Sequence, residues 1–170
     1  QVLWEKGDKI DVLWDDGKTN AVADPYNSSL EASFKTNVSE DAQIFYAVHP
    51  SSEASSLDGG KVTVAVPAVQ DGTFSSACIA AAKADANDHL AFKHMVSFVE
   101  CTIDRCGTLT LSCGPEISGE VNATFGEDGS LDEYTQMGSG DKITVDIPRS
   151  GTYYIALLPD VEMEYIYFTL

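Results

Sequence analysis

The amino-acid sequence predicts an all-β fold, an antiparallel two-sheet sandwich with at most one short helix. Apolar residues recur with a period of two in most segments. Gly, Pro, Asp and Ser clusters separate these segments at short intervals. A helical period of 3.6 is largely missing. With 170 residues, the chain is long enough to bury roughly 70% of its extended surface without disulfides or metals.

Seven segments have the alternation and length typical of half-buried strands. Residues 9–14 come first, and the turn composition of 15–18 follows them. A long polar loop separates the second and third segments. The segments are 9–14, 44–48, 62–66, 109–111, 121–125, 143–147 and 153–158.

The segment Leu90–Ile103 changes parity in its middle. Large residues occupy even positions through Phe98 and odd positions from Val99 onward. A β-bulge would produce this change, and so would a strand that crosses from one sheet to another. We expect this segment to be the longest central strand.

Residues 75–88 form the one segment rich in helix formers, with six alanines. They show no clean amphipathic stripe, so a short helix and a non-helical path remain equal alternatives.

One domain accounts for most of the chain. No internal repeat or interdomain linker stands out, so we assign residues 1–163 to one β-sandwich. Residues 164–170 are apolar and aromatic, and we expect them to be a last strand or the start of a further domain. The N-terminus lacks signal-peptide features, which predicts an intracellular protein or an export signal that has been removed.

The charge balance excludes several classes of partner. Ten Lys and Arg stand against 27 Asp and Glu, a formal net charge of −17. Such a surface repels nucleic-acid phosphates and anionic lipids. We therefore expect no nucleic-acid binding. We also expect no transmembrane segment, because no apolar run approaches the length of a membrane span.

The four cysteines do not match a zinc motif, because they form no CxxC pair. Three disulfide pairings remain open. Cys101 and Cys113 fall on predicted inward faces and are interpreted as buried thiols. Cys106 lies in a turn and is expected to be exposed, and Cys78 completes the set.

No residues are assigned to a catalytic, cofactor or metal site. His49, His89 and His94 lie on separate segments without a nucleophile motif. His94 is interpreted as a core or interface histidine bonded to backbone. The acidic stretches 15–20 and 128–133 do not match an EF-hand loop and are interpreted as solvated turns.

Several segments resemble the fimbrillin family, the type V pilus subunits and related surface lipoproteins of Bacteroidetes-type bacteria. Trp4–Val12 resembles an opening Trp-x-x-Gly-Asp-x-Ile-x-Val strand, and Phe45–Pro50 resembles an aromatic-Ala-Val-Tyr-Pro strand end. Val66–Gln70 is similar to a Pro-x-x-Gln element. Leu90–Met95 resembles a Leu-x-Phe-Lys-His-Leu strand start, and Ile143–Pro159 resembles the closing strands of the family's N-terminal domain.

The resemblance covers about residues 4–160 and departs from the family at His49, where Tyr is usual. It implies a transthyretin-like Greek-key sandwich. In this family, protease removal of an N-terminal strand opens a groove that a neighbouring subunit's strand fills. The physical basis is strand addition to a free sheet edge. The lipoprotein signal and second sandwich usual in the family are absent from this sequence.

The leading hypothesis is therefore a non-enzymatic structural and adhesive protein of the outer cell surface. It would be a pilus subunit or fimbrillin-like adhesin, exported, with a lipid-anchored precursor and no cofactor. Its partners would be other pilin subunits and host proteins or glycans. The alternative is a secreted glycan-binding module that uses exposed Trp or Tyr on loops. A hydrolase on an all-β scaffold is a third reading, disfavoured because no nucleophile or metal motif is present.

Overall fold

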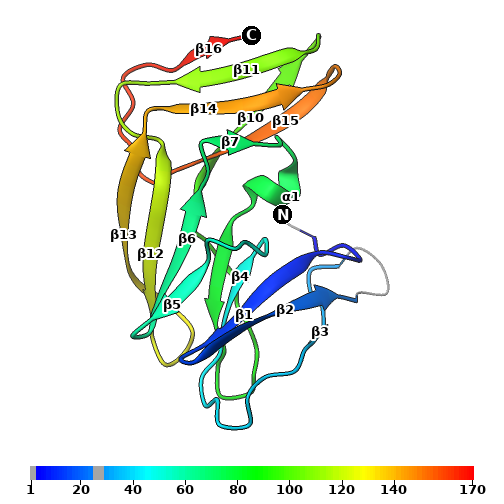
Figure 1. Ribbon diagram of the computed structural model, residues 1–170, viewed down its shortest axis with the longest axis vertical. Helices are drawn as coiled ribbons and strands as arrows, with labels where there is room; N and C mark the ends of the chain where they lie inside the picture. The colour runs from blue at the N-terminus through cyan, green and yellow to red at the C-terminus, as the bar shows by residue number, and fades with distance from the viewer. Residues whose placement is uncertain (1–2, 25–28) are drawn as a thin grey trace.

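The computed structural model describes residues 3–24 and 29–170 and shows an all-β sandwich (Figure 1). Within these residues the chain forms sixteen strands and one four-residue helix. The predicted all-β class and the single short helix are confirmed. The strands are divided among four sheets.

The first sheet has six strands in the order β3-β2-β1-β4-β8-β9. The second has four strands in the order β13-β12-β6-β5. The bounds of the first are Phe34–Lys35 (β3), Gly17–Ala23 (β2), Lys9–Trp14 (β1), Tyr46–His49 (β4), Ala80–Lys83 (β8) and Lys93–His94 (β9). Those of the second are Leu131–Gly140 (β13), Ser118–Phe125 (β12), Lys61–Val66 (β6) and Ser56–Asp58 (β5).

The third sheet has the order β16-β11-β14-β7, and the fourth is a ribbon of β10 and β15. Strand β7 pairs parallel to β14, whereas all other pairs between named strands are antiparallel. The bounds are Tyr167–Thr169 (β16), Gly107–Ser112 (β11), Lys142–Ile147 (β14), Val69–Gln70 (β7), Ser97–Ile103 (β10) and Gly151–Leu157 (β15).

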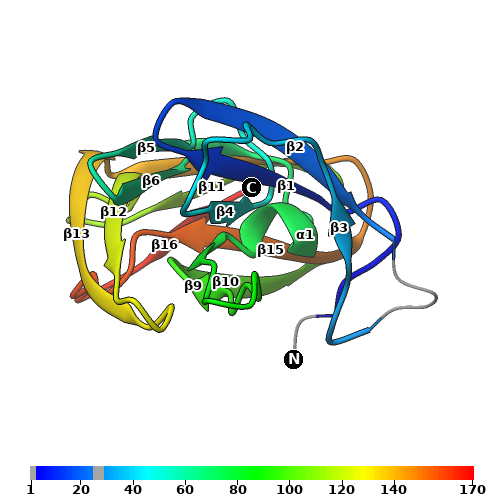
Figure 2. The same cartoon turned by 90° about the horizontal axis from the view of Figure 1, so that it is seen from below.

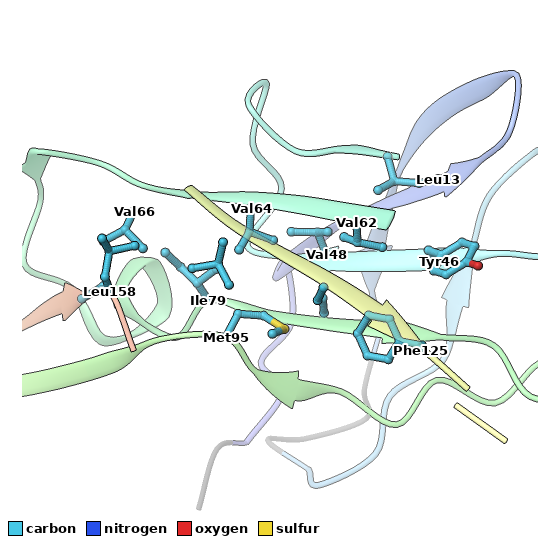
Figure 3. Close-up of a cluster of buried hydrophobic side chains, with 14 of the residues drawn as sticks. Leu13, Tyr46, Val48, Val62, Val64, Val66, Ile79, Met95, Phe125 and Leu158 are labelled. Atoms are coloured by element: carbon cyan, nitrogen blue, oxygen red, sulfur yellow. The ribbon is translucent and has the colours of Figure 1, made fainter. Parts of the chain in front are cut away.

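Two interior cores hold these sheets together. The larger lies between the six-stranded sheet and the sheet of β12 and β6, where side chains such as Val48, Val64 and Phe125 meet (Figure 3). The second lies between the sheet of β11 and β14 and the ribbon. Strand β15 joins the two cores, because Ala156 faces the first and Ile155 faces the second. This is the alternation that the sequence showed in residues 153–158.

A third cluster covers the other face of the six-stranded sheet. Ile10, Val12, Ala21 and Ala47 are buried there. Partly buried aromatic and aliphatic residues from the N-terminal segment and from loops lie over them. The six-stranded sheet is therefore apolar on both faces around β1, and Asp11 is the one charged residue of this strand that is buried.

Asp11 anchors the polar loop after β4. Lys18 Nζ lies 3.0 Å from its Oδ2. Burial pushes the pKa of Asp11 upward, but hydrogen bonds to the loop serines and Lys18 outweigh it and hold the pKa below its usual value. The hydrogen-bond donors to this carboxylate are Asn20 Nδ2, Ser51 Oγ, the Ser52 amide and Ser55 Oγ.

The segment Leu90–Ile103 is not one long strand, so that expectation is wrong. It divides into β9, in the six-stranded sheet, and β10, in the ribbon. The chain thus crosses between sheets at Met95 and Val96, ahead of the parity change, and this crossing is one of the two alternatives that the sequence left open. Met95 packs into the first core, whereas Val99 packs against the second.

The alanine-rich segment is mostly strand. Helix α1 spans only Phe74–Ala77, with Thr73 as its N-cap. Ala80–Lys83 form β8, whose alanines are buried between β4 and β9. Small side chains suit this position because both faces of the sheet are covered.

Candidate functional site

The ribbon of β10 and β15 has two edges that differ in what they contact. The two strands pair without interruption from Ser97 opposite Leu157 to Ile103 opposite Gly151. One face of the ribbon packs on the second core through residues such as Val99 and Ile155. Strand β15 also packs on the first core through Ala156, whereas β10 is held from one face, and the two edges depend on separate contacts.

The edge of β15 is closed by hydrogen bonds from outside the ribbon. The Tyr154 amide donates to Gly72 O (2.9 Å), and the Leu158 amide donates to Ile117 O (2.9 Å). Between them, the side-chain amide of Gln70 bonds Ala156 twice. The Ala156 amide donates to Gln70 Oε1 (2.8 Å), and Gln70 Nε2 donates to Ala156 O (2.9 Å). One glutamine side chain therefore replaces a neighbouring strand.

These contacts also determine which backbone groups of β10 are free. In an antiparallel strand, the N–H and C=O of one residue point to the same side, and successive residues alternate. The N–H and C=O groups of the even-numbered residues of β15 point away from β10. The hydrogen bonds between the two strands are therefore made by their odd-numbered residues. The N–H and C=O groups of Phe98, Glu100 and Thr102 therefore point outward.

No described residue pairs with this outer edge of β10. Figure 2 shows β10 at the margin of the molecule, with β15 on its inner side. The side chains of Phe98, Glu100 and Thr102 are all exposed. We call these three residues the open edge.

The open edge has few of the usual protections against strand pairing, and the exposed charge of Glu100 is the exception. Natural edge strands are protected by Pro, Lys, bulges or short length. Strand β10 has seven residues, no Pro, no Lys and no register shift. By contrast, the longer outer strand β13 has register shifts near both ends of its pairing with β12 and carries Asp132 and Glu133.

An exposed aromatic cluster lies beside the open edge. The ring centroid of Phe74 is 5.0 Å from that of Tyr154 and 6.1 Å from that of Phe98. Phe98 is 44% exposed and Phe74 is 37% exposed. Glu100, directly opposite Tyr154 in the ladder, raises the pKa of the Tyr154 hydroxyl. This cluster offers apolar contact area next to free backbone groups.

The four cysteines are all free thiols, and Cys101 lies on β10 with its side chain toward the second core. Cys113 is buried and Cys101 is half-buried, both packed on the second core, as predicted. Cys106 is exposed, also as predicted. Burial raises the pKa of Cys78, Cys101 and Cys113, which keeps these thiols protonated and weakly nucleophilic.

The prediction of a core position for His94 is wrong, because this residue is exposed on the two-residue outer strand β9, and an interface position stays a prediction. Its Nδ1 lies 3.7 Å from Cys78 Sγ. His49 has the environment expected for His94. It is buried, its Nδ1 lies 3.2 Å from Lys9 O, and burial lowers its pKa. His89 lies 3.7 Å from the Asp85 carboxylate.

The acidic stretches lie in hairpins. Asp15 and Asp16 form the turn between β1 and β2. Asp128 accepts hydrogen bonds from the Ser130 amide (3.0 Å) and hydroxyl (2.6 Å), which lower the Asp128 pKa. In residues 3–24 and 29–170, no group of three or more His, Cys, Asp or Glu is placed to hold a metal ion. No helix of that same part of the chain is both long and apolar enough to cross a bilayer.

Sequence reasoning did not identify the residues that define the two edges. Gln70 entered only through the Pro-x-x-Gln resemblance, with no role attached. The parity change before Val99 was a visible signal for an irregularity within Leu90–Ile103. Which side of β10 is free depends on contacts from Gln70, Gly72 and Ile117, far away in sequence.

Comparisons with protein-family models, curated proteins and solved structures found no match.

Proposed function

We propose that this protein is a non-enzymatic structural and adhesive subunit of a bacterial cell surface, assembled by addition of a partner's β-strand to the open edge. It would act as an exported pilus subunit or fimbrillin-like adhesin with a transthyretin-like sandwich and a lipid-anchored precursor. Its partners would be other subunits, together with host proteins or glycans. The sequence resemblance and the geometry of β10 support this proposal.

The observation that carries the proposal is the outer edge of the seven-residue strand β10, which no described strand pairs with. An added strand gains main-chain hydrogen bonds from the edge and specificity from the side chains on its faces. Here the outward groups of Phe98, Glu100 and Thr102 supply the hydrogen bonds. The aromatic cluster of Phe74, Phe98 and Tyr154 supplies apolar area on the same face.

Glu100 restricts which strand fits. If two copies paired antiparallel through their β10 strands about Glu100, two carboxylates would face each other, which is destabilising. The formal charge of −17 adds repulsion between copies. The best partner strand therefore has a neutral or basic residue opposite Glu100 and an apolar residue near Phe98.

Strand β1 is an unsuitable strand for exchange. It pairs with β2 on one side and β4 on the other, and Ile10 and Leu13 are buried on its two faces. Its removal would divide the six-stranded sheet. The assembly that we propose therefore adds a strand at β10 and leaves β1 in place.

The experiment compares two lysine variants of one cross-strand pair. Thr102→Lys introduces an edge lysine, whereas Thr152→Lys places the same charge on the ladder partner of Thr102. The outer side of β15 is already bonded at Tyr154 and Ala156, so we expect an incoming strand at β10 and not at β15. Full-length gene product from the producing cells is run unheated on SDS gels, and its filaments are counted by electron microscopy.

We expect SDS-resistant ladders and filaments from the unmodified protein and from Thr152→Lys, and strongly reduced ladders from Thr102→Lys. Thermal unfolding checks that both variants are folded. Monomers alone from the unmodified protein would contradict an assembly function. Equal ladders from both variants would show that assembly uses another surface than β10.

A further inference from the structure

A groove lies over the third apolar cluster, on the outer face of the six-stranded sheet. It consists of two adjoining cavities of about 340 Å³ and about 590 Å³. Both are lined by Trp4, Leu30, Leu90 and Phe92, so they form one continuous depression. Each volume falls in the range of small-molecule sites. We call it the Trp4 groove.

Two backbone pairs fix the walls of this groove. The Trp4 amide donates to Ser29 O (2.7 Å), and the Ser29 amide donates to Trp4 O (3.1 Å). On the opposite wall, Ala84 forms a bridge with Leu90. The Asp85 carboxylate accepts the amides of Asn87 (2.8 Å) and His89 (2.9 Å), which closes the loop between them.

The Trp4 ring is held by three aromatic neighbours. Its centroid lies 5.1 Å from that of Phe34, 5.0 Å from that of His49 and 5.2 Å from that of Phe92, all with edge-to-face geometry. These contacts fix the indole orientation. The residue remains partly exposed and lines both cavities. The groove thus has a rigid aromatic residue at its centre.

The wider cavity adds polar groups around this aromatic centre. Glu31, Ser33, Asp88 and His89 line it together with Trp4. Glu31 and Asp88 are exposed, so their carboxylates are free to accept hydrogen bonds from hydroxyl groups. A wholly apolar ligand would remove water from these groups without replacing their hydrogen bonds.

We propose that the Trp4 groove binds a neutral saccharide. A sugar ring presents an apolar C–H face to an aromatic ring and hydroxyl groups at its edge, and the groove provides contacts for both. Two carboxylates in the lining and the net charge of −17 disfavour a sialylated or sulfated glycan. The groove and the open edge share no residue, so this site is independent of assembly by strand addition.

The test is a glycan array of neutral, sialylated and sulfated oligosaccharides, followed by calorimetric titration of the best neutral ligand. The variants are Trp4→Ala, Glu31→Gln and Asp88→Asn. Asn tolerates the positive φ of 60° at position 88. Glu133→Gln, an exposed change on β13 outside the groove, is the matched control.

We expect saturable binding of a neutral glycan, loss of binding in Trp4→Ala, weaker binding in Glu31→Gln and Asp88→Asn, and no change in Glu133→Gln. Trp4 also packs over the third core, so circular dichroism must show a folded variant. If Trp4→Ala does not fold, the affinities of Glu31→Gln and Asp88→Asn for the neutral glycan test the proposal instead. Absence of neutral-glycan binding, a preference for anionic glycans, or unchanged affinity in the groove variants would overturn the proposal.

Discussion

The two edges of the ribbon differ although they belong to paired strands of equal length. The outer groups of β15 are bonded to Gln70, Gly72 and Ile117, whereas those of β10 have no partner among the described residues. The closed edge belongs to the interior, since Ala156 is 1% exposed. The open edge is at the surface, where water satisfies its groups.

The comparison shows that an edge is closed where its burial requires it. A buried N–H or C=O without a partner costs about 1–3 kcal/mol, whereas an exposed one costs little. The loop of residues 70–72 therefore stabilises the fold. The open edge is free to bind a partner without loss of monomer stability, and four predictions test this difference.

The largest effect is expected from Gln70→Leu. This change keeps the side-chain volume but leaves the Ala156 N–H and C=O without partners. We expect a loss of about 2–4 kcal/mol of unfolding free energy, measured by urea denaturation. Gln136→Leu on exposed β13 is the control and should be near neutral. If the loss of unfolding free energy is no larger than in Gln136→Leu, water hydrogen-bonds the Ala156 N–H and C=O in place of the glutamine.

Gly72→Ala should have the next largest effect. Gly72 has φ of 72°, and an added Cβ would lie 2.7 Å from both Tyr153 Cδ1 and Val145 Cγ1. Left-handed strain and overpacking together should cost about 2–4 kcal/mol in unfolding free energy. Gly59→Ala, with φ of 55° and open space, isolates the strain. Equal losses in the two variants would show that Tyr153 and Val145 move aside and that overpacking adds nothing to the left-handed strain.

Acid should weaken the closed edge through Asp71. Burial raises the pKa of Asp71, but hydrogen bonds from the Thr73 amide, the Ser76 hydroxyl and the Thr73 hydroxyl outweigh it, so the pKa is lowered. Because the folded pKa lies below the unfolded value of about 3.9, the contribution is complete above that value. It is lost as pH falls through the folded pKa.

The measurement is the unfolding free energy of the unmodified protein and of Asp71→Asn as pH decreases. The difference between them should be constant near neutral pH and shrink in acid below about pH 4. Asp132→Asn, outside this loop, serves as the control. A difference that grows in acid would contradict the sign of the pKa shift.

The smallest expected effect is a difference in amide exchange rates along β10 of the unmodified protein. Amide hydrogen exchange should alternate along β10, with slow exchange at Val99 and Cys101 and fast exchange at Phe98, Glu100 and Thr102. The reason is that the odd amides bond β15 and the even amides face solvent. NMR measures each amide separately. Uniform protection along β10 would show that another group covers the open edge.

Local pattern was sufficient to predict most strands. Alternation at residues 9–14, 62–66 and 143–147 corresponds directly to β1, β6 and β14. The strand expected at 44–48 is displaced to Tyr46–His49. Strands β6 and β14 are predictable because each has one face against a core and one toward a less buried environment, which is the condition that produces a period of two. Strands β1 and β4 are buried on both faces, and their apolar residues with the turn composition after β1 were enough to predict them.

The pattern failed at β8, where both faces are buried, and at β9, where neither face is buried. Ala80–Lys83 are covered on both faces, so they show no alternation, and their alanines resembled a helix. His94 appeared buried because it continued the parity of Phe92, yet β9 is an exposed outer strand. The Trp4 groove combines residues 4, 30–34 and 88–92, which no local pattern relates to one another.

The sequence by itself determined the all-β class, the acidic surface, most strands and an irregularity within Leu90–Ile103, because composition and side-chain period are local properties. The tertiary structure alone decided which edge is closed and which is open. That choice depends on whether Gln70 reaches Ala156, 86 positions along the chain, and on what lies beyond Glu100. Backbone groups are the same in every residue, so only their neighbours in space distinguish a paired edge from a free one.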